Sequence, residues 1–274
     1  MSTKLKIDAS VITTKGNIRS KNEDNFYFNG LIMKKTDDSD LYSHSLNTTE
    51  DRFIFAVCDG MGGEEAGEEA SLTAVQSLSD MYVARESKEF NSMPQLKNFM
   101  DNYVDISNSL IFKHSQAISK HMGTTLASVI FFGDKAIALN IGDSRVYLFR
   151  NSDLVQLTID HTEAERLIRL GIIERNSPYL QNSNNMLTRH LGVSPQCGKM
   201  EADYSDEIKL QKGDLFLICS DGLTNHVSDK ELKRCFSDPS NSYSTCKNLI
   251  DQAIKNNGTD NITALIIKIE DVLI

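Results

Sequence analysis

The chain has 274 residues, with 38 Asp and Glu against 29 Lys and Arg, so its formal net charge is −9. Its 40% hydrophobic and 24% charged residues are ordinary for a globular protein, which excludes a disordered or fibrous chain. The acidic balance argues against nucleic acid or an anionic membrane as the main partner, because both would repel the chain at long range.

Cysteine usage and the lack of a targeting segment predict a cytoplasmic protein. The five cysteines are odd in number, irregularly spaced and without a C-x-x-C pair, so neither a disulfide framework nor a zinc knuckle is indicated. Residues 1–19 contain no apolar stretch typical of a secretory signal. No segment approaches the roughly 18 apolar residues that a membrane span needs.

Short apolar, β-branched runs predict the strands of the protein. In chain order they are Phe53–Cys58, Leu126–Phe132, Lys135–Ile141, Arg145–Arg150, Leu215–Cys219 and Ile262–Ile269. Short turns at Gly133-Asp134 and Gly142-Asp143 join the run that ends at Phe132 to the next two. These turns predict two antiparallel hairpins rather than β-α-β crossovers.

Three longer segments show the periodicity of amphipathic helices. The first starts at Glu64, the second has Pro94 in its first turn and runs to about residue 118, and the third ends at Asn257-Gly258, a favourable C-terminal cap. Strand meanders combined with such helices predict an α+β layered sandwich.

Two stretches have the composition of insertions. Residues 34–50 are polar and rich in Ser, Asp and Thr, so they are expected to form an exposed loop between two strands. Residues 163–187 begin as a short charged helix and continue into an Asn- and Ser-rich run, which predicts an irregular surface excursion. With no repeat and no Pro- or Gly-rich linker, a single domain over residues 1–274 is expected.

Acidic residues recur where apolar strands end or turns begin, at Glu23-Asp24, Asp59-Gly60, Asp143, Asp221-Gly222 and Asp260-Asn261. Each alone is ordinary turn chemistry. Five such sites at the tips of core strands could converge, and carboxylates without histidine or thiolate suit hard cations such as Mg²⁺ or Mn²⁺. Carboxylates forced together without a cation would raise one another's pKa, so convergence would imply a metal site.

These residues and their neighbours form eight short motifs in chain order. They are Arg19-x-x-x-Glu23-Asp24, Asp59-Gly60-Met61-Gly62-Gly63, Met122-Gly123-Thr124-Thr125, Gly142-Asp143-Ser144-Arg145, Asp160-His161-Thr162, Leu187-Thr188-Arg189, Ser220-Asp221-Gly222-Leu223 and Asp260-Asn261-Ile262-Thr263. From about residue 10 to 270, the series resembles the metal-dependent protein phosphatases of the PPM, or protein phosphatase 2C, family, in its bacterial branch.

The resemblance implies a four-layer α-β-β-α sandwich, with two central antiparallel sheets flanked by helix pairs and a variable flap at about residues 163–187. It implies hydrolysis of phosphoserine and phosphothreonine in proteins by a metal-activated water, opposed to a Ser/Thr kinase. The implied enzyme is a cytoplasmic monomer that acts on phosphorylated proteins and binds neither nucleic acid nor membrane.

The same resemblance implies two Mn²⁺ or Mg²⁺ ions per chain and a weaker third. Asp59 would bridge both metals, and the Gly60 carbonyl would bind one of them. Asp221 and Asp260 would complete the other site, which makes these three aspartates the predicted catalytic residues. Asp143 matches the acid that helps to hold the third metal in bacterial relatives.

Other matched residues surround this centre. Glu23 and Asp24 match acids that face the metals directly or through bound water, and Arg19 matches the residue that grips the substrate phosphate. Many eukaryotic relatives carry a histidine, proposed to protonate the leaving oxygen, where this chain has Met61. Either metal-bound water or another group such as His161 would then supply the proton, although a structural role for His161 is favoured.

Two other functions stay open at this stage, namely a catalytically silent phosphatase-like module that binds or regulates, and a hydrolase of small phosphate esters. The intact acid series speaks against the silent module, because a degenerate member would be expected to lose some of these acids. Arg145 and Arg189 are expected to form structural ion pairs rather than to bind phosphate.

Overall fold

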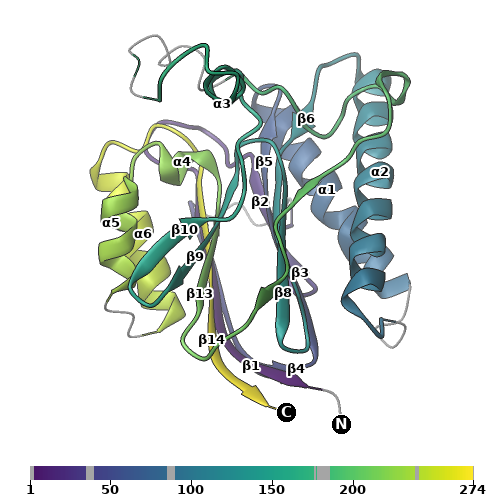
Figure 1. The fold of residues 1–274 in the computed structure, drawn as a ribbon. Helices are drawn as coiled ribbons and strands as arrows, with labels where there is room; N and C mark the ends of the chain where they lie inside the picture. Colours follow the sequence, from purple (N-terminus) through teal and green to yellow (C-terminus); the bar gives the residue numbers. More distant parts are fainter. Residues whose placement is uncertain are drawn as a thin grey trace.

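The computed structural model describes residues 3–34, 40–84, 90–175, 177, 186–237 and 241–273, except for the side chains of Glu64 and Glu65. Two antiparallel sheets lie face to face, and helices cover the outer face of each (Figure 1). The predicted four-layer α+β sandwich is therefore confirmed.

The first sheet is built from strands at both ends and in the middle of the chain. Its members are β1 (Lys4–Thr14), β4 (Leu41–Glu50), β9 (Arg145–Arg150), β10 (Asp153–Gln156), β13 (Leu215–Cys219) and β14 (Ile262–Leu273). They lie in the order β10-β9-β13-β14-β1-β4, and every pairing is antiparallel.

The second sheet contains the remaining strands, which are β2 (Asp24–Phe28), β3 (Leu31–Ile32), β5 (Arg52–Met61), β6 (Gly123–Thr124), β7 (Leu126–Phe132), β8 (Lys135–Ile141), β11 (Asp203–Tyr204) and β12 (Ile208–Lys209). The main order is β11-β8-β7-β5-β2-β3, with β12 paired to β8 and β6 to β5. The hairpin predicted at Gly133-Asp134 is confirmed, since β7 pairs with β8.

Two helices cover each sheet. They are α1 (Glu64–Ala84) and α2 (Met93–Ile118) on the second sheet, and α5 (Asp229–Phe236) and α6 (Ser242–Lys255) on the first (Figure 1). The short helices α3 (Glu163–Arg169) and α4 (Asp221–Thr224) lie at the end of the sandwich away from both termini, and a 3-10 turn spans Pro195–Cys197. Just after the end of α6, Asn257 has a left-handed backbone conformation with φ 69°.

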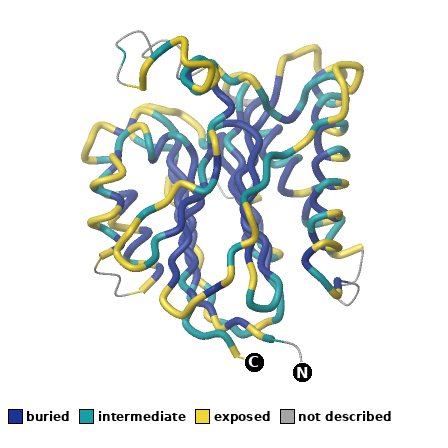
Figure 2. The backbone as a smooth tube through the Cα atoms, in the orientation of Figure 1, coloured by how far each residue is buried: buried dark blue, intermediate teal, exposed yellow. Residues whose placement is uncertain are grey.

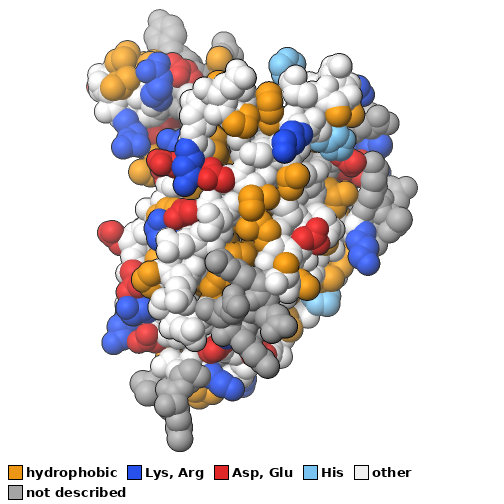
Figure 3. Space-filling view, turned by 90° about the vertical axis from the view of Figure 1, so that its right-hand side faces the viewer, with side chains coloured by type: hydrophobic (Ala, Val, Ile, Leu, Met, Phe, Trp, Pro, Cys, Tyr) orange, Lys and Arg blue, Asp and Glu red, His pale blue; other side chains and the backbone are white. Residues whose placement is uncertain are grey.

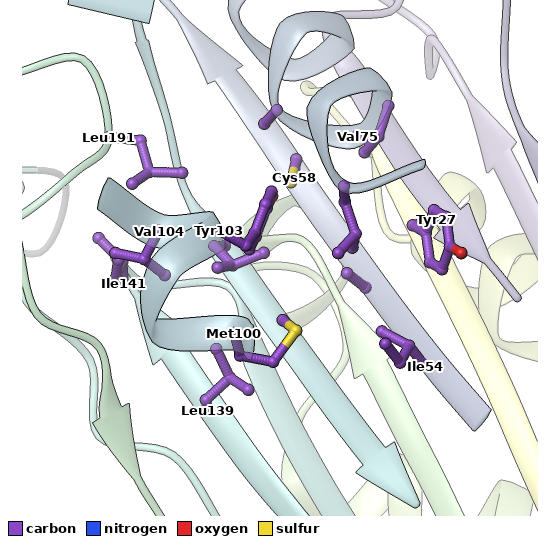
Figure 4. Close-up of a cluster of buried hydrophobic side chains, with 14 of the residues drawn as sticks. Tyr27, Ile54, Cys58, Val75, Met100, Tyr103, Val104, Leu139, Ile141 and Leu191 are labelled. Atoms are coloured by element: carbon purple, nitrogen blue, oxygen red, sulfur yellow. The ribbon is translucent and has the colours of Figure 1, made fainter. Parts of the chain in front are cut away.

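The central strands of both sheets are buried on both faces, which explains why they read as nearly continuous apolar runs. In β5, Phe53, Phe55 and Val57 pack between the sheets, whereas Ile54 and Cys58 pack against α1 and α2 (Figure 4). Figure 2 shows the resulting dark-blue strands between helices that are exposed on their outer sides. The layering thus follows from the period of two along each central strand.

Two local expectations were wrong. Residues 35–39 lie outside the described residues, but Leu41–Glu50 is the edge strand β4 rather than a loop. An edge strand exposes most of its side chains, so its polar composition resembled that of a loop; Tyr42 and Leu46 nevertheless pack on the core between the sheets. The second predicted hairpin is absent, because the chain at Gly142–Ser144 crosses from β8 in one sheet to β9 in the other.

Candidate active site

Asp24 and Asp59 lie opposite each other on β2 and β5. Asp24 is 1% exposed, and its Oδ2 accepts hydrogen bonds from Ser220 Oγ at 2.7 Å and Thr263 Oγ1 at 2.6 Å. Because these hydroxyls come from the other sheet, Asp24 links the two sheets at this end. Its second buried oxygen, Oδ1, has no hydrogen-bond partner among the described residues.

Asp221 and Asp260 come from the first sheet. Asp221 begins α4 directly after β13, and Asp260 stands two residues before β14 begins. A Cβ on Gly222 would lie 1.9 Å from the Asn261 carbonyl oxygen, so the absence of a side chain lets α4 approach the start of β14. The two aspartates are therefore held side by side by a close backbone contact.

Asn261 ties these acids to the other sheet. Its Oδ1 accepts from the Glu23 amide at 2.8 Å, and its Nδ2 donates to the carbonyls of Lys21 at 2.8 Å and Lys15 at 3.2 Å. Its own amide donates to Asp260 Oδ1 at 2.8 Å. One buried amide side chain thus fixes the loop before Glu23-Asp24 relative to Asp260.

Two glycines make room for Glu23. A Cβ on Gly60 would lie 2.1 Å from the Gly67 carbonyl oxygen and 2.6 Å from that of Glu23. A Cβ on Gly67, in α1, would lie 2.2 Å from Glu23 Oε2. The end of β5 therefore packs directly on α1, with the Glu23 carboxylate in the space that Gly67 leaves open.

Asp143 reaches the same region through the crossover between the sheets. Gly142 has φ 101°, and a Cβ there would lie 2.6 Å from Thr125 Cγ2. Thr125 Oγ1 lies 2.6 Å from Ser144 Oγ and accepts from the Asp59 amide at 2.9 Å. Thr125 therefore connects the crossover to Asp59.

The five aspartates form one electrostatic cluster. Burial raises the pKa of Asp59 well above its ordinary range, and the charges of Asp24, Asp221, Asp143 and Asp260 raise it further. Burial raises the pKa of Asp24 and of Asp143 to about 7, with a further increase from Asp221 in both. The convergence that the sequence left open is thus present in the fold.

This donor set fits a hard divalent cation, because it offers buried carboxylate oxygens, including the unpartnered Asp24 Oδ1. Within the described part of the chain, however, no three His, Cys, Asp or Glu side chains are already arranged to hold a metal ion. Instead, Arg19 pairs with Asp260 at 2.9 Å. A cation bound by Asp260 would have to replace this contact.

Arg19 stands at the edge of the cluster. Its Nη2 lies 2.9 Å from Asp260 Oδ2, and its side chain is 46% exposed. Partial burial lowers its pKa, but the hydrogen bond to Asp260 and the charges of Asp260, Glu23 and Asp59 raise it overall. The guanidinium is therefore charged, close to the acids and accessible from solvent.

His161 has a structural position. Its Nδ1 accepts from the Gly142 amide at 3.0 Å, its Nε2 lies 3.0 Å from Asp203 Oδ2, and burial lowers its pKa. Both ring nitrogens are thus engaged, which disfavours His161 as a proton donor. Arg145 pairs with Asp160 at 2.6 Å and Arg189 with Asp203 at 2.6 Å, so the predicted structural ion pairs are confirmed.

The sequence patterns did not single out the residues that position the acids, which are Gly67, Thr125, Ser220, Asn261 and Thr263. Four of them lie inside the eight motifs, so their closeness in sequence to other motif residues could have predicted a role near the acids. Gly67 stands outside them, although a glycine within a helical pattern is itself a sign of close packing.

Comparison with known proteins gives a consistent result. The family model described as protein phosphatase 2C matches residues 14–262. A serine/threonine phosphatase, stp, of Listeria monocytogenes is 32% identical over 258 residues, which cover 93% of each protein.

Solved structures agree. The serine/threonine phosphatase of S. agalactiae superimposes with a TM-score of 0.81 at 25% identity, covering 96% of this chain and 100% of that one. The catalytic domain of the phosphatase PstP, solved in complex with 2 manganese ions, gives a TM-score of 0.76 at 27% identity, covering 97% and 100%.

Proposed function

This chain belongs to the protein phosphatase 2C family and is a metal-dependent serine/threonine protein phosphatase, and from that premise we propose that its acidic end holds a dinuclear Mn²⁺ or Mg²⁺ centre. The observation that carries the proposal is the convergence of Asp24, Asp59, Asp143 and Asp221, where loss of solvent and the charge of neighbouring carboxylates raise the pKa of each. The manganese-bound relative supports the same number of ions.

The proposed ligands are those that the family resemblance implies. Asp59 would bind both ions, the Gly60 carbonyl would bind one, and Asp221 with Asp260 would complete the other site. Asp143, on the crossover, would help to hold a weaker third ion. When bound, the ions would activate a water for attack on phosphorus and neutralise charge on the phosphoryl oxygens.

The surrounding residues keep these ligands in place. The Asp59 carbonyl accepts from the Thr125 amide at 2.9 Å and from Thr124 Oγ1 at 2.8 Å, which fixes the end of β5. Ser220 and Thr263 occupy one oxygen of Asp24 and leave the other without a hydrogen-bond partner among the described residues. Glu23 and Asp24 would thus face the ions directly or through water.

Arg19 would bind the phosphate of the substrate. Its planar guanidinium can donate to two phosphate oxygens at once, and one of its nitrogens donates to Asp260 Oδ2 at 2.9 Å. Since Asp260 would also bind metal, loading of the centre would release Arg19 toward the phosphate. The products would be Ser or Thr in the protein and inorganic phosphate.

The substrates would be phosphorylated proteins, and the enzyme would oppose a Ser/Thr kinase in the cytoplasm as a monomer. The odd, irregularly spaced cysteines, all of them free thiols, suit a reducing compartment. No helix in the described segments is long and apolar enough to cross a membrane.

The proposal is tested by phosphate release from a phosphothreonine peptide with and without Mn²⁺. We expect release that depends on Mn²⁺, is lost in chelator, and falls by at least about a hundredfold in Asp59→Asn and in Asp221→Asn. Asp153→Asn is the matched control, because that carboxylate is 74% exposed on β10 and pairs with Lys233.

Robust activity in chelator would overturn the metal-centred proposal. Metal binding without turnover on any phosphopeptide would instead favour the silent module. A sugar phosphate hydrolysed faster than the peptide would favour the small-ester hydrolase.

A further inference from the structure

A surface pocket of about 360 Å³ lies beside the candidate active site. Its walls come from the end of β5, the C-terminal end of α2, the segment before β6, and the loop that follows His190. The residues that characterise it are Met61, Phe112, Gln116, Met122, His190 and Val193. Figure 3 shows hydrophobic and histidine side chains close together near the top of the α2 face.

The pocket is built by close backbone contacts rather than by loose side chains. A Cβ on Gly62 would lie 2.3 Å from the His121 carbonyl oxygen, and one on Gly192 would lie 2.6 Å from that of Met122. Asn108, buried on α2, accepts from the amides of Gly192 at 2.8 Å and Val193 at 3.0 Å. The loop that follows His190, which forms one wall of the pocket, is therefore fixed relative to α2.

The pocket neighbours the proposed metal centre along β5. Met61 stands two residues beyond Asp59 on β5, which is about 7 Å along a strand, and it pairs with Gly123 of β6. A substrate whose phosphate is held at Asp59 and Arg19 must continue across the adjacent surface. The residues on either side of its phosphoresidue can then reach this pocket.

The residues that line the pocket indicate which kind of substrate side chain it can accept. Two thioethers, an aromatic ring and an aliphatic side chain line the pocket, together with neutral hydroxyl and amide groups and two histidines, and none of the described lining residues carries a carboxylate. Met and Phe side chains adapt to aromatic and aliphatic groups and contact aromatic rings favourably. Such a wall favours an apolar side chain over a charged one.

We propose that this pocket binds an apolar side chain of the phosphoprotein substrate, Leu or an aromatic residue, within a few positions of the phosphoresidue. The pocket is thereby a specificity site for dephosphorylation. This inference rests on the proposed function, because it needs a phosphopeptide to be held at the adjacent acids.

The test uses the full chain with Mn²⁺ and a series of phosphothreonine peptides. A single Phe or Leu is stepped through the three positions before and after the phosphothreonine in an Ala-rich background. At one or two neighbouring positions we expect kcat/KM to be about tenfold higher than with Ala, as for a partly buried apolar side chain.

Two variants change the pocket in opposite ways. Val193→Trp fills it and Phe112→Ala removes part of its wall, and in both we expect the ratio of the apolar to the Ala peptide to fall to about twofold or less. Because the readout is a ratio within one variant, a general loss of activity cancels. Leu110→Ala is the control, since Leu110 is 42% exposed on the same helix outside the pocket.

Equal kcat/KM values across the whole series would overturn the inference while leaving the proposed function intact. A preference that persists in both Val193→Trp and Phe112→Ala would also overturn it. Failure of every phosphopeptide to release phosphate with Mn²⁺ would overturn the proposed function, and the inference with it.

Discussion

Asp24 shows how one buried carboxylate can serve a site at the expense of stability. It is 1% exposed, and two hydroxyl hydrogen bonds support only one of its oxygens. Burial, opposed by those hydrogen bonds and reinforced by Asp221 and Asp260, raises its pKa to about 7. A buried charge of this kind costs free energy unless a cation compensates it.

Replacing this charge should stabilise the metal-free protein. In Asp24→Asn, the amide oxygen can still accept from Ser220 and Thr263, while the amide nitrogen takes the place of the unpartnered oxygen near other carboxylates. We expect Tm in chelator at about pH 8 to rise by about 2–6 °C, which corresponds to about 1–2 kcal/mol for a protein of this size. Differential scanning calorimetry measures it.

Asp153→Asn again serves as control, because removing an exposed charge should change Tm by about 1 °C or less. A lower Tm for Asp24→Asn than for the unmodified chain in chelator would show that the carboxylate stabilises the fold. The interpretation that the buried charge of Asp24 lowers the stability of the metal-free protein would then be wrong.

At the scale of elements, the crossover between β8 and β9 decides where Asp143 lies. A hairpin at Gly142-Asp143 would have kept both strands in one sheet. Instead, the chain passes from the second sheet to the first, and Asp143 becomes partly buried near Asp221 and Asp160. The link between two sheets thus becomes part of the site.

Gly142→Ala tests this arrangement. The left-handed φ of 101° and the 2.6 Å approach to Thr125 Cγ2 both disfavour a side chain. We expect a loss of about 2–4 kcal/mol in the free energy of unfolding, of which about 1–2 kcal/mol is backbone strain. Urea denaturation at fixed Mn²⁺ measures the change.

Gly198→Ala separates the two causes. Gly198 has φ 115°, but no atom lies within 4 Å of a Cβ built there, so this variant carries backbone strain without the clash. If Gly142→Ala costs no more than Gly198→Ala, the close contact with Thr125 does not contribute.

At the scale of the whole molecule, two sheets meet with their acidic ends together, on one core formed between them. That shared core supports the expectation of a single domain over residues 1–274, which stays a prediction. Within the expected flap, α3 is described, whereas Asn176 and residues 178–185 lie outside the described residues. Two bound divalent cations would reduce the formal net charge from −9 to −5.

The acidic cluster makes stability depend on pH and metal together. Burial first, and the neighbouring carboxylates second, raise the pKa of Asp24 and Asp143 from 3.8 to about 7 in the folded chain. Between these values the folded state binds more protons than the unfolded state, so the free energy of unfolding falls as pH rises. A divalent cation should replace these protons.

We therefore expect the Tm of the metal-free protein to fall between about pH 5 and pH 8, and the gain in Tm on adding MnCl₂ to grow over the same range. Paired thermal scans with MnCl₂ and with chelator measure both trends. A gain that is constant or shrinks with rising pH would contradict the competition between protons and metal.

Local patterns in the sequence were enough for several core strands, for the three longer helices and for the family. Leu126–Phe132, Lys135–Ile141 and Leu215–Cys219 are strands with the predicted bounds, because period and turn residues act over a few positions. The same locality explains the failure at Leu41–Glu50, where pairing with β1 rather than composition makes the strand.

Only the tertiary structure determined that the acids converge at one place. Asp24 and Asp221 are far apart in the chain, and no period of two or of 3.6 residues encodes their meeting. Their proximity depends on the register of β2 against β5, on the crossover at Gly142, and on the hydrogen bonds of Asn261 across both sheets. The sequence by itself determined which carboxylates stand at strand ends, and long-range packing determined that they share one buried, charged site.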